Sequence, residues 1–96
     1  MMAHDLHGKR ALVTGASSGL GAHFARLLAR QGVEVVLAAR RAETLSGIVA
    51  EIRHQGGAAS AMRLDVRDIE ASSRAISELG TLSILVNNAG IVREGA

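Results

Sequence analysis

The residues with the clearest chemical capacity are the glycines and serines of the segment TGASSGLG, from Thr14 to Gly21. The glycines are spaced G-x-x-x-G-x-G, directly after a strand-like run and at the start of a helix-like one. A helix start offers unpaired backbone N–H groups and the positive end of the helix dipole, and both attract phosphate. Glycine permits positive φ and lets a phosphate approach the backbone. The segment therefore predicts a dinucleotide phosphate site, with Ser17 and Ser18 as hydroxyl donors, although such a turn can also exist without a ligand.

Two further polar positions follow strand-like runs. Asp65 can accept a hydrogen bond from an adenine amino group, or it can be an ordinary turn or helix-capping carboxylate, which the residue type alone favours. Ala89 and Gly90 are small enough for a sugar to approach closely, whereas Asn87 and Asn88 can also tie neighbouring loops together. The four histidines have no metal-ligand spacing, so we predict no metal site.

The elements that must position these residues alternate along the chain. Apolar runs predict strands over residues 10–13, 33–39, 58–64 and 84–86. Apolar residues at helical spacing predict three helices between the strands. Their stripes are Leu20, Phe24, Leu27 and Leu28 in the first helix, Leu45, Ile48, Val49 and Ile52 in the second, and Ile69, Ile76 and Leu79 in the third.

Boundary residues agree with this reading. The sequence HQGG, residues 54–57, ends the second helix with the glycine expected at such a stop, and Asp68 is suited to cap the start of the third. Strands and helices that alternate over short connections predict a parallel sheet with right-handed crossovers. We therefore expect an α/β fold of the Rossmann type.

Composition narrows the class of protein. The 96 residues suffice for one small domain, and their 48% hydrophobic content argues against disorder. The absence of cysteine excludes a disulfide scaffold and a thiolate metal site. Eleven basic and nine acidic residues are scattered with a single aromatic, which argues against a nucleic-acid surface. No run has the length of a membrane span, and the first residues lack the apolar core of a signal peptide, so we expect a cytoplasmic protein.

Three motifs, in this order, resemble those of the short-chain dehydrogenase/reductase family: TGASSGLG at 14–21, LDV at 64–66 and NNAG at 87–90. The glycine spacing differs from the G-x-G-x-x-G fingerprint of other dinucleotide-binding proteins. The resemblance covers essentially the whole chain. It implies a doubly wound parallel sheet of strand order 3-2-1-4 with three helices, incomplete at about four strands, in which residues 1–96 are the N-terminal part of a single dinucleotide-binding domain. It also implies an oxidoreductase that reduces carbonyl groups or oxidises secondary alcohols.

The same resemblance implies which residues bind the cofactor. The phosphates would contact the glycine-rich turn, the adenine would contact the LDV segment, and the ribose would lie along the NNAG segment. The implied residues are, in that order, Gly15, Ser17, Ser18, Gly19, Leu20 and Gly21, then Asp65 and Val66, then Asn88, Ala89 and Gly90.

The end of the second predicted strand bears on the choice of cofactor. NAD-binding enzymes place a carboxylate there to bind the ribose 2′-OH. Here Ala39 is followed by Arg40 and Arg41, and a guanidinium can bind a 2′-phosphate through two parallel charge-assisted hydrogen bonds. We therefore predict NADP(H) over NAD(H). The alternative is that both arginines are solvated charges at the start of a helix.

The catalytic residues of the family are a serine, a tyrosine and a lysine, the last two in a Y-x-x-x-K arrangement beyond the NNAG segment. This chain has no tyrosine, and its only lysine, Lys9, precedes the first predicted strand. We therefore expect no catalytic residue within it and a catalytic C-terminal half that is absent. Two other readings stay open: a non-catalytic nucleotide-binding module, or an interaction fragment that docks through the fourth strand.

The fourth predicted strand also bears on association. A sheet that ends at residues 83–86 leaves an apolar edge with unpaired backbone groups, which can pair with another chain. We therefore expect a homo-oligomer or self-association through this edge.

Overall fold

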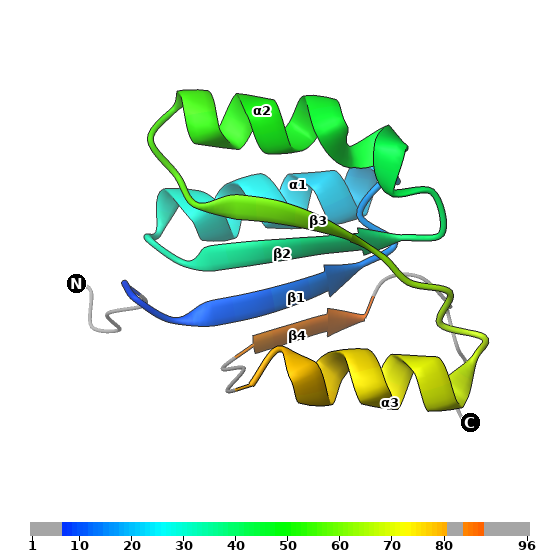
Figure 1. The fold of residues 1–96 in the computed structure, drawn as a ribbon. Coiled ribbons are helices and arrows are strands. Elements are labelled where there is room, and N and C mark those ends of the chain that lie inside the picture. Colours follow the sequence, from blue (N-terminus) through cyan, green and yellow to red (C-terminus); the bar gives the residue numbers. More distant parts are fainter. Residues whose placement is uncertain (1–6, 81–83, 88–96) are drawn as a thin grey trace.

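A computed structural model describes residues 7–80 and 84–87 of the chain. Strands and helices alternate along it, as predicted (Figure 1). In chain order the elements are β1 (Arg10–Thr14), α1 (Gly19–Arg30), β2 (Glu34–Ala39), the 3-10 helix η1 (Ala42–Leu45), α2 (Ser46–His54), β3 (Ala59–Arg63), α3 (Ile69–Glu78) and β4 (Ile84–Asn87). No helix within the described ranges is both long enough and apolar enough to cross a bilayer.

The four strands form one parallel sheet of order β3-β2-β1-β4, which confirms the predicted topology. Helices α1 and α2 cover one face and α3 covers the other (Figure 1). All four strands point the same way, so their carboxyl ends meet at one edge of the sheet. In this arrangement Thr14 lies beside Ala38 and Asn87, and Ala39 lies beside Arg63.

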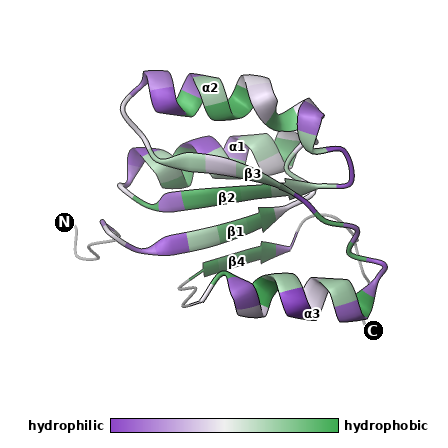
Figure 2. Ribbon diagram, in the orientation of Figure 1, coloured by the Kyte–Doolittle hydropathy of each residue, from purple (hydrophilic) through white to green (hydrophobic). Residues whose placement is uncertain are grey.

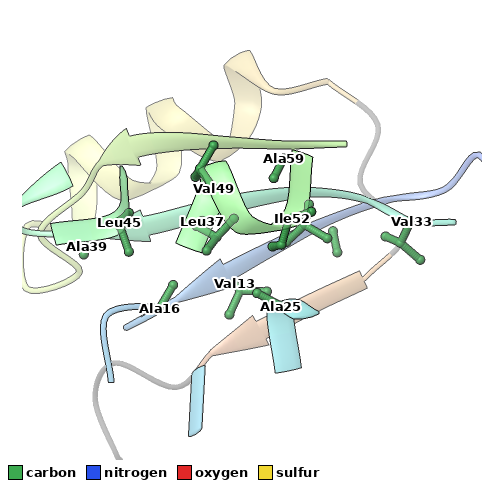
Figure 3. Close-up of a cluster of buried hydrophobic side chains, with 12 residues drawn as sticks. Val13, Ala16, Ala25, Val33, Leu37, Ala39, Leu45, Val49, Ile52 and Ala59 are labelled. Atoms are coloured by element: carbon green, nitrogen blue, oxygen red, sulfur yellow. The ribbon is translucent and has the colours of Figure 1, made fainter. Parts of the chain in front are cut away.

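The larger core lies between the sheet and helices α1 and α2 (Figure 3). Alternate residues of β1 and β2 point into it, including Val13 and Leu37, and Leu45, Val49 and Ile52 pack on them from η1 and α2. The apolar colouring of β1 and β2 is nearly continuous, as is typical of strands buried on both faces (Figure 2). A smaller core on the opposite face is closed by α3.

The apolar stripe predicted for α1 is wrong in part. Leu20 is 57% exposed and Leu27 is 41% exposed, whereas Ala22 and Ala25 are buried. The helix approaches the sheet through small side chains and through Leu28, which packs against the larger core, so Leu20 and Leu27 lie beside the contact rather than in it. Hydrophobic periodicity weights leucine above alanine, and therefore placed the contact face too far towards the leucines.

The prediction for α3 also needs one correction. Ile76 and Leu79 pack against the smaller core as predicted, but Ile69 is 76% exposed. Ile69 and Ile76 share an angular position on the helix but lie about 10 Å apart along its axis. Periodicity reports the angle alone, so it could not show that the first turn of α3 extends past the packed region.

Candidate functional site

The turn between β1 and α1 is built around two residues. Gly15 has φ 63°, in the left-handed region that favours glycine. Ser18 caps α1: its Oγ accepts a hydrogen bond from the N–H of Gly21 over 3.2 Å and donates to the carbonyl of Gly15 over 2.9 Å. The Ser18 hydroxyl, predicted as a phosphate donor, is thus engaged in holding the helix start. Ser17 is exposed beside it.

The first turn of α1 leaves two backbone donors available. The N–H groups of Gly19 and Leu20 have no hydrogen-bond partner among the described residues, whereas those of Gly21 and Ala22 bond to Ser18. A Cβ built on Gly19 would have no atom within 4 Å, and its φ is not positive. The fold therefore does not need glycine at position 19. Because glycine has no side chain, the space over the N–H groups of Gly19 and Leu20 stays open.

A hollow of about 500 Å³ lies at the carboxyl ends of the strands, next to this turn. The turn and the end of β2 are joined by a hydrogen bond of 3.2 Å from the N–H of Ala16 to the carbonyl of Ala38. The volume is within the range of small-molecule sites, about 300–1,000 Å³. The hollow is lined by Ser17, Ala39, Arg40, Arg41, Thr44, Arg63, Asp65 and Arg67.

The hollow is strongly cationic, because four guanidinium groups face one carboxylate. Arg67 forms an ion pair with Asp65. The side chains of Arg40, Arg41 and Arg63 have no ion-pair or hydrogen-bond partner within the described part of the chain. The arrangement suits an anionic ligand that accepts hydrogen bonds from guanidinium groups.

Asp65 begins a turn two residues after the end of β3, and its carbonyl accepts from the N–H of Asp68 over 2.9 Å. A turn carboxylate is one of the two roles that the sequence left open for it. Its Oδ1 accepts hydrogen bonds from the backbone N–H and the Nε of Arg67, both over 3.0 Å. Hydrogen bonds from the Arg67 side chain and backbone lower the pKa of this carboxyl to about 2, and the charges of Arg67 and Arg40 act in the same direction. Asp65 therefore stays ionised and able to accept further hydrogen bonds.

At the end of β4, Asn87 joins neighbouring strands. The Oγ1 of Thr14 donates to the Oδ1 of Asn87 over 3.0 Å, which links the last residues of β1 and β4. Asn87 therefore joins two strand ends, whereas the sequence suggested a link between neighbouring loops. The predicted ribose contacts Asn88, Ala89 and Gly90 lie outside the described residues.

The structure brings most of the predicted site residues to one edge of the sheet. Ser17, Arg40, Arg41 and Asp65 line the hollow, and Gly15 and Gly19 lie in the adjoining turn. Gly21 is buried against the sheet, and the half-buried Val66 packs on the smaller core.

Sequence reasoning missed Thr44, Arg63 and Arg67, which also line the hollow. A signal for Arg63 existed: it ends the third predicted strand, and the ends of neighbouring parallel strands lie side by side.

Comparisons with known proteins identify the family of this chain. Residues 9–96 match the family described as short chain dehydrogenase. The chain is 45% identical, over 98 residues, to 2,5-dichloro-2,5-cyclohexadiene-1,4-diol dehydrogenase LinX of Sphingobium indicum; the match covers 98% of this chain and 39% of that protein. The chain thus spans well under half the length of this relative.

Solved structures give the same result. A dehydrogenase/reductase from Sinorhizobium meliloti 1021 is 49% identical with a TM-score of 0.82, over 91% of this chain and 36% of that one. A metagenomic short-chain oxidoreductase, solved in complex with NADP, is 39% identical with a TM-score of 0.81, over 92% of this chain and 42% of that one. On the match of residues 9–96, the chain belongs to the short-chain dehydrogenase family.

Proposed function

We propose that residues 1–96 form the N-terminal, dinucleotide-binding part of an NADP(H)-dependent oxidoreductase that interconverts carbonyl groups and secondary alcohols. The bound nicotinamide would supply or accept the hydride. The chain's own residues would bind and orient the cofactor. The groups that handle the substrate's proton would lie outside these residues, because the chain contains no tyrosine.

One observation carries the preference for NADP(H). Arg40 and Arg41 follow the last residue of β2 and line a hollow in which neither side chain forms an ion pair with the described residues. A carboxylate at this strand end would repel a 2′-phosphate, whereas a guanidinium can bind it through two parallel charge-assisted hydrogen bonds. The NADP complex of the metagenomic relative is consistent with this assignment.

The remaining contacts are proposed from the open turn before α1 and from the family resemblance. The N–H groups of Gly19 and Leu20, which have no partner among the described residues, would donate to the pyrophosphate. Ser17 lies at the border between turn and hollow. The Asp65 carboxylate would accept from the adenine amino group, beside the backbone of Val66. The ribose would contact Asn88, Ala89 and Gly90.

Calorimetric titration of the chain with NADPH and with NADH tests this proposal. We expect saturable binding of NADPH that is tighter than binding of NADH. Arg40→Asp should reverse or abolish the preference. Arg74→Asp makes the same change of charge on α3, away from the hollow, and should leave the preference intact. Equal binding of both cofactors, or equal effects of the two variants, would contradict the proposal.

The exposed edge of the sheet supports a second role, in association. Leu85 of β4 is 54% exposed and lies beside the buried Leu12 on the face that α3 covers, and β4 is the last strand of the described sheet. We infer that this apolar edge pairs with a second copy of the chain or with a further segment of a longer protein.

A further inference from the structure

We propose that Arg63, at the end of β3, is a second ligand of the cofactor's 2′-phosphate and sets the preference for the phosphorylated cofactor jointly with Arg40. The inference rests on the proposed function. It assigns specificity to a residue 23 positions away from Arg40 in the sequence, on a different strand.

The register of the sheet brings Arg63 to the end of β2. Its Cα pairs with that of Ala39, the residue before Arg40, and the N–H of Leu64 donates to the carbonyl of Ala39 over 2.9 Å. This hydrogen bond fixes the two strand ends relative to each other directly beside the hollow. The positions of Arg40 and Arg63 are therefore set by the sheet rather than by a loop.

The Arg63 side chain lies on the face of the sheet that carries the larger core, next to the hollow. Side chains alternate along a strand, so Arg63 shares a face with Ala59, which packs in the larger core with Ala39 (Figure 3). Ala39 has a small side chain, and this leaves space beside Arg63 where a larger neighbour would fill it. The exposed Arg63 lines the hollow together with Arg40 and Ser17.

The distribution of unpaired charge supports the same assignment. Among the described residues, the side chains of Arg10, Arg26 and Arg67 pair with carboxylates, and that of Arg53 donates to a carbonyl. Five other arginine side chains have no such partner there, and three of the five line this one hollow: Arg40, Arg41 and Arg63. The hollow contains one carboxylate, that of Asp65, and it already pairs with Arg67. The positive charge of the other three guanidinium groups therefore exceeds the negative charge beside them, and a bound anion would relieve their mutual repulsion.

A phosphate monoester is the anion that fits this arrangement. It carries about two negative charges at neutral pH and three acceptor oxygens, so it can accept from two guanidinium groups at once. A ribose 2′-OH carries no charge and would leave both arginines uncompensated. Arg67, the fourth arginine of the hollow, already pairs with Asp65, so we do not propose it as a ligand of the 2′-phosphate.

The test uses two ligands that differ only in the 2′-phosphate: adenosine 2′,5′-bisphosphate and adenosine 5′-monophosphate. Binding of each is measured by calorimetry for the 96-residue chain and for Arg63→Gln, Arg40→Gln and Arg74→Gln. We expect Arg63→Gln to weaken binding of the bisphosphate about tenfold or more, the usual loss for a charge-assisted hydrogen bond, and to change binding of the monophosphate less than twofold. Arg63→Lys should restore part of the loss, and Arg74→Gln should have no effect.

The outcomes separate this inference from the proposed function. If Arg40→Gln weakens binding of the bisphosphate selectively and Arg63→Gln does not, the role of Arg63 is excluded and the NADP(H) preference stands. Equal weakening of both ligands by Arg63→Gln would also exclude a 2′-phosphate role. If the unaltered chain does not distinguish the two ligands, or binds neither, the proposed function fails together with the inference.

Discussion

Arg67 engages both carboxylate oxygens of Asp65: its Nε lies 3.0 Å from Oδ1 and its Nη2 lies 2.9 Å from Oδ2. Its backbone N–H adds a third hydrogen bond to Oδ1. A carboxylate can accept about four hydrogen bonds, so Oδ2 retains room for one more donor. An adenine amino group could use that position without breaking the pair.

The pair predicts how the titration of Asp65 responds to mutation. The pKa of about 2 should rise in Arg67→Ala, because the two side-chain hydrogen bonds are lost, but should stay below 3.8 because the backbone hydrogen bond remains. The pKa is lower in the folded chain than in the unfolded one. The pair's contribution to stability is therefore complete above about pH 4 and is lost as the pH falls towards 2. NMR titration of the Asp65 carboxyl in both proteins measures this; identical pKa values would contradict it.

Gly19 allows the requirements of the fold to be separated from those of binding. Gly19→Ala should raise the free energy of unfolding by up to about 1 kcal/mol, because a Cβ meets no atom there and alanine is a better helix former. Affinity for the dinucleotide should nevertheless fall about tenfold or more, at least about 1.4 kcal/mol. The methyl group would block the approach to the N–H groups of Gly19 and Leu20, which no described residue accepts from.

Gly47 provides the matched control for Gly19. It also lies in the first turn of a helix, α2, and a Cβ there would likewise meet no atom within 4 Å. Gly47→Ala should raise stability to a similar extent and leave dinucleotide affinity unchanged. Urea denaturation and calorimetry together provide both readouts. Unimpaired binding by Gly19→Ala would show that no ligand approaches this turn closely.

Ser18 and Ser17 should differ in their contributions to stability. Ser18→Ala removes the cap of α1 and the hydrogen bond to Gly15, and should lower the free energy of unfolding by about 1 kcal/mol. Ser17→Ala changes an exposed hydroxyl with no hydrogen-bond partner in the described structure, and should have little effect on stability. Denaturant unfolding of the two variants tests the difference, and equal losses would exclude a specific capping role for Ser18.

A substitution of Leu85 tests the proposed association through β4. Leu85→Lys places a charge at an exposed position of β4 and should weaken self-association about tenfold or more, since burial of a leucine contributes about 1.5–3 kcal/mol. Ile69→Lys is the control, because Ile69 is more exposed than Leu85 but lies on α3. Sedimentation velocity over a range of concentrations gives the oligomeric state. A larger effect from Ile69→Lys would place the interface on α3 instead.

Local signals in the sequence were sufficient to predict the four strands and three α-helices of the described residues. They did not predict the 3-10 helix η1, in which Leu45 lies instead of in α2. The Asp68 side chain accepts from the N–H of Ala71 over 3.0 Å, as expected of a helix cap, and Gly56 with φ 92° follows the end of α2. The strand order followed from the family resemblance. What the sequence could not show was how closely α1 approaches the sheet, because that distance depends on side-chain size on both surfaces rather than on periodicity.

The candidate site was predictable only where its residues belong to motifs. Arg40 was found because it follows a strand whose end has a known role. Arg67 was missed because its importance depends on an ion pair with Asp65. A spacing of two residues in the sequence does not show whether the two side chains turn towards each other.

The central position of β1 has a consequence for the motions of the site. Ala11, Leu12 and Val13 are fully buried, and β1 is hydrogen-bonded to a strand on each side. Its amides should therefore exchange with solvent only on near-global unfolding, whereas the exposed arginine side chains of the hollow can change rotamer freely. The strand that supports the proposed phosphate site is thus preorganised, and the conformational entropy lost on binding would come mainly from flexible side chains at the border of the hollow.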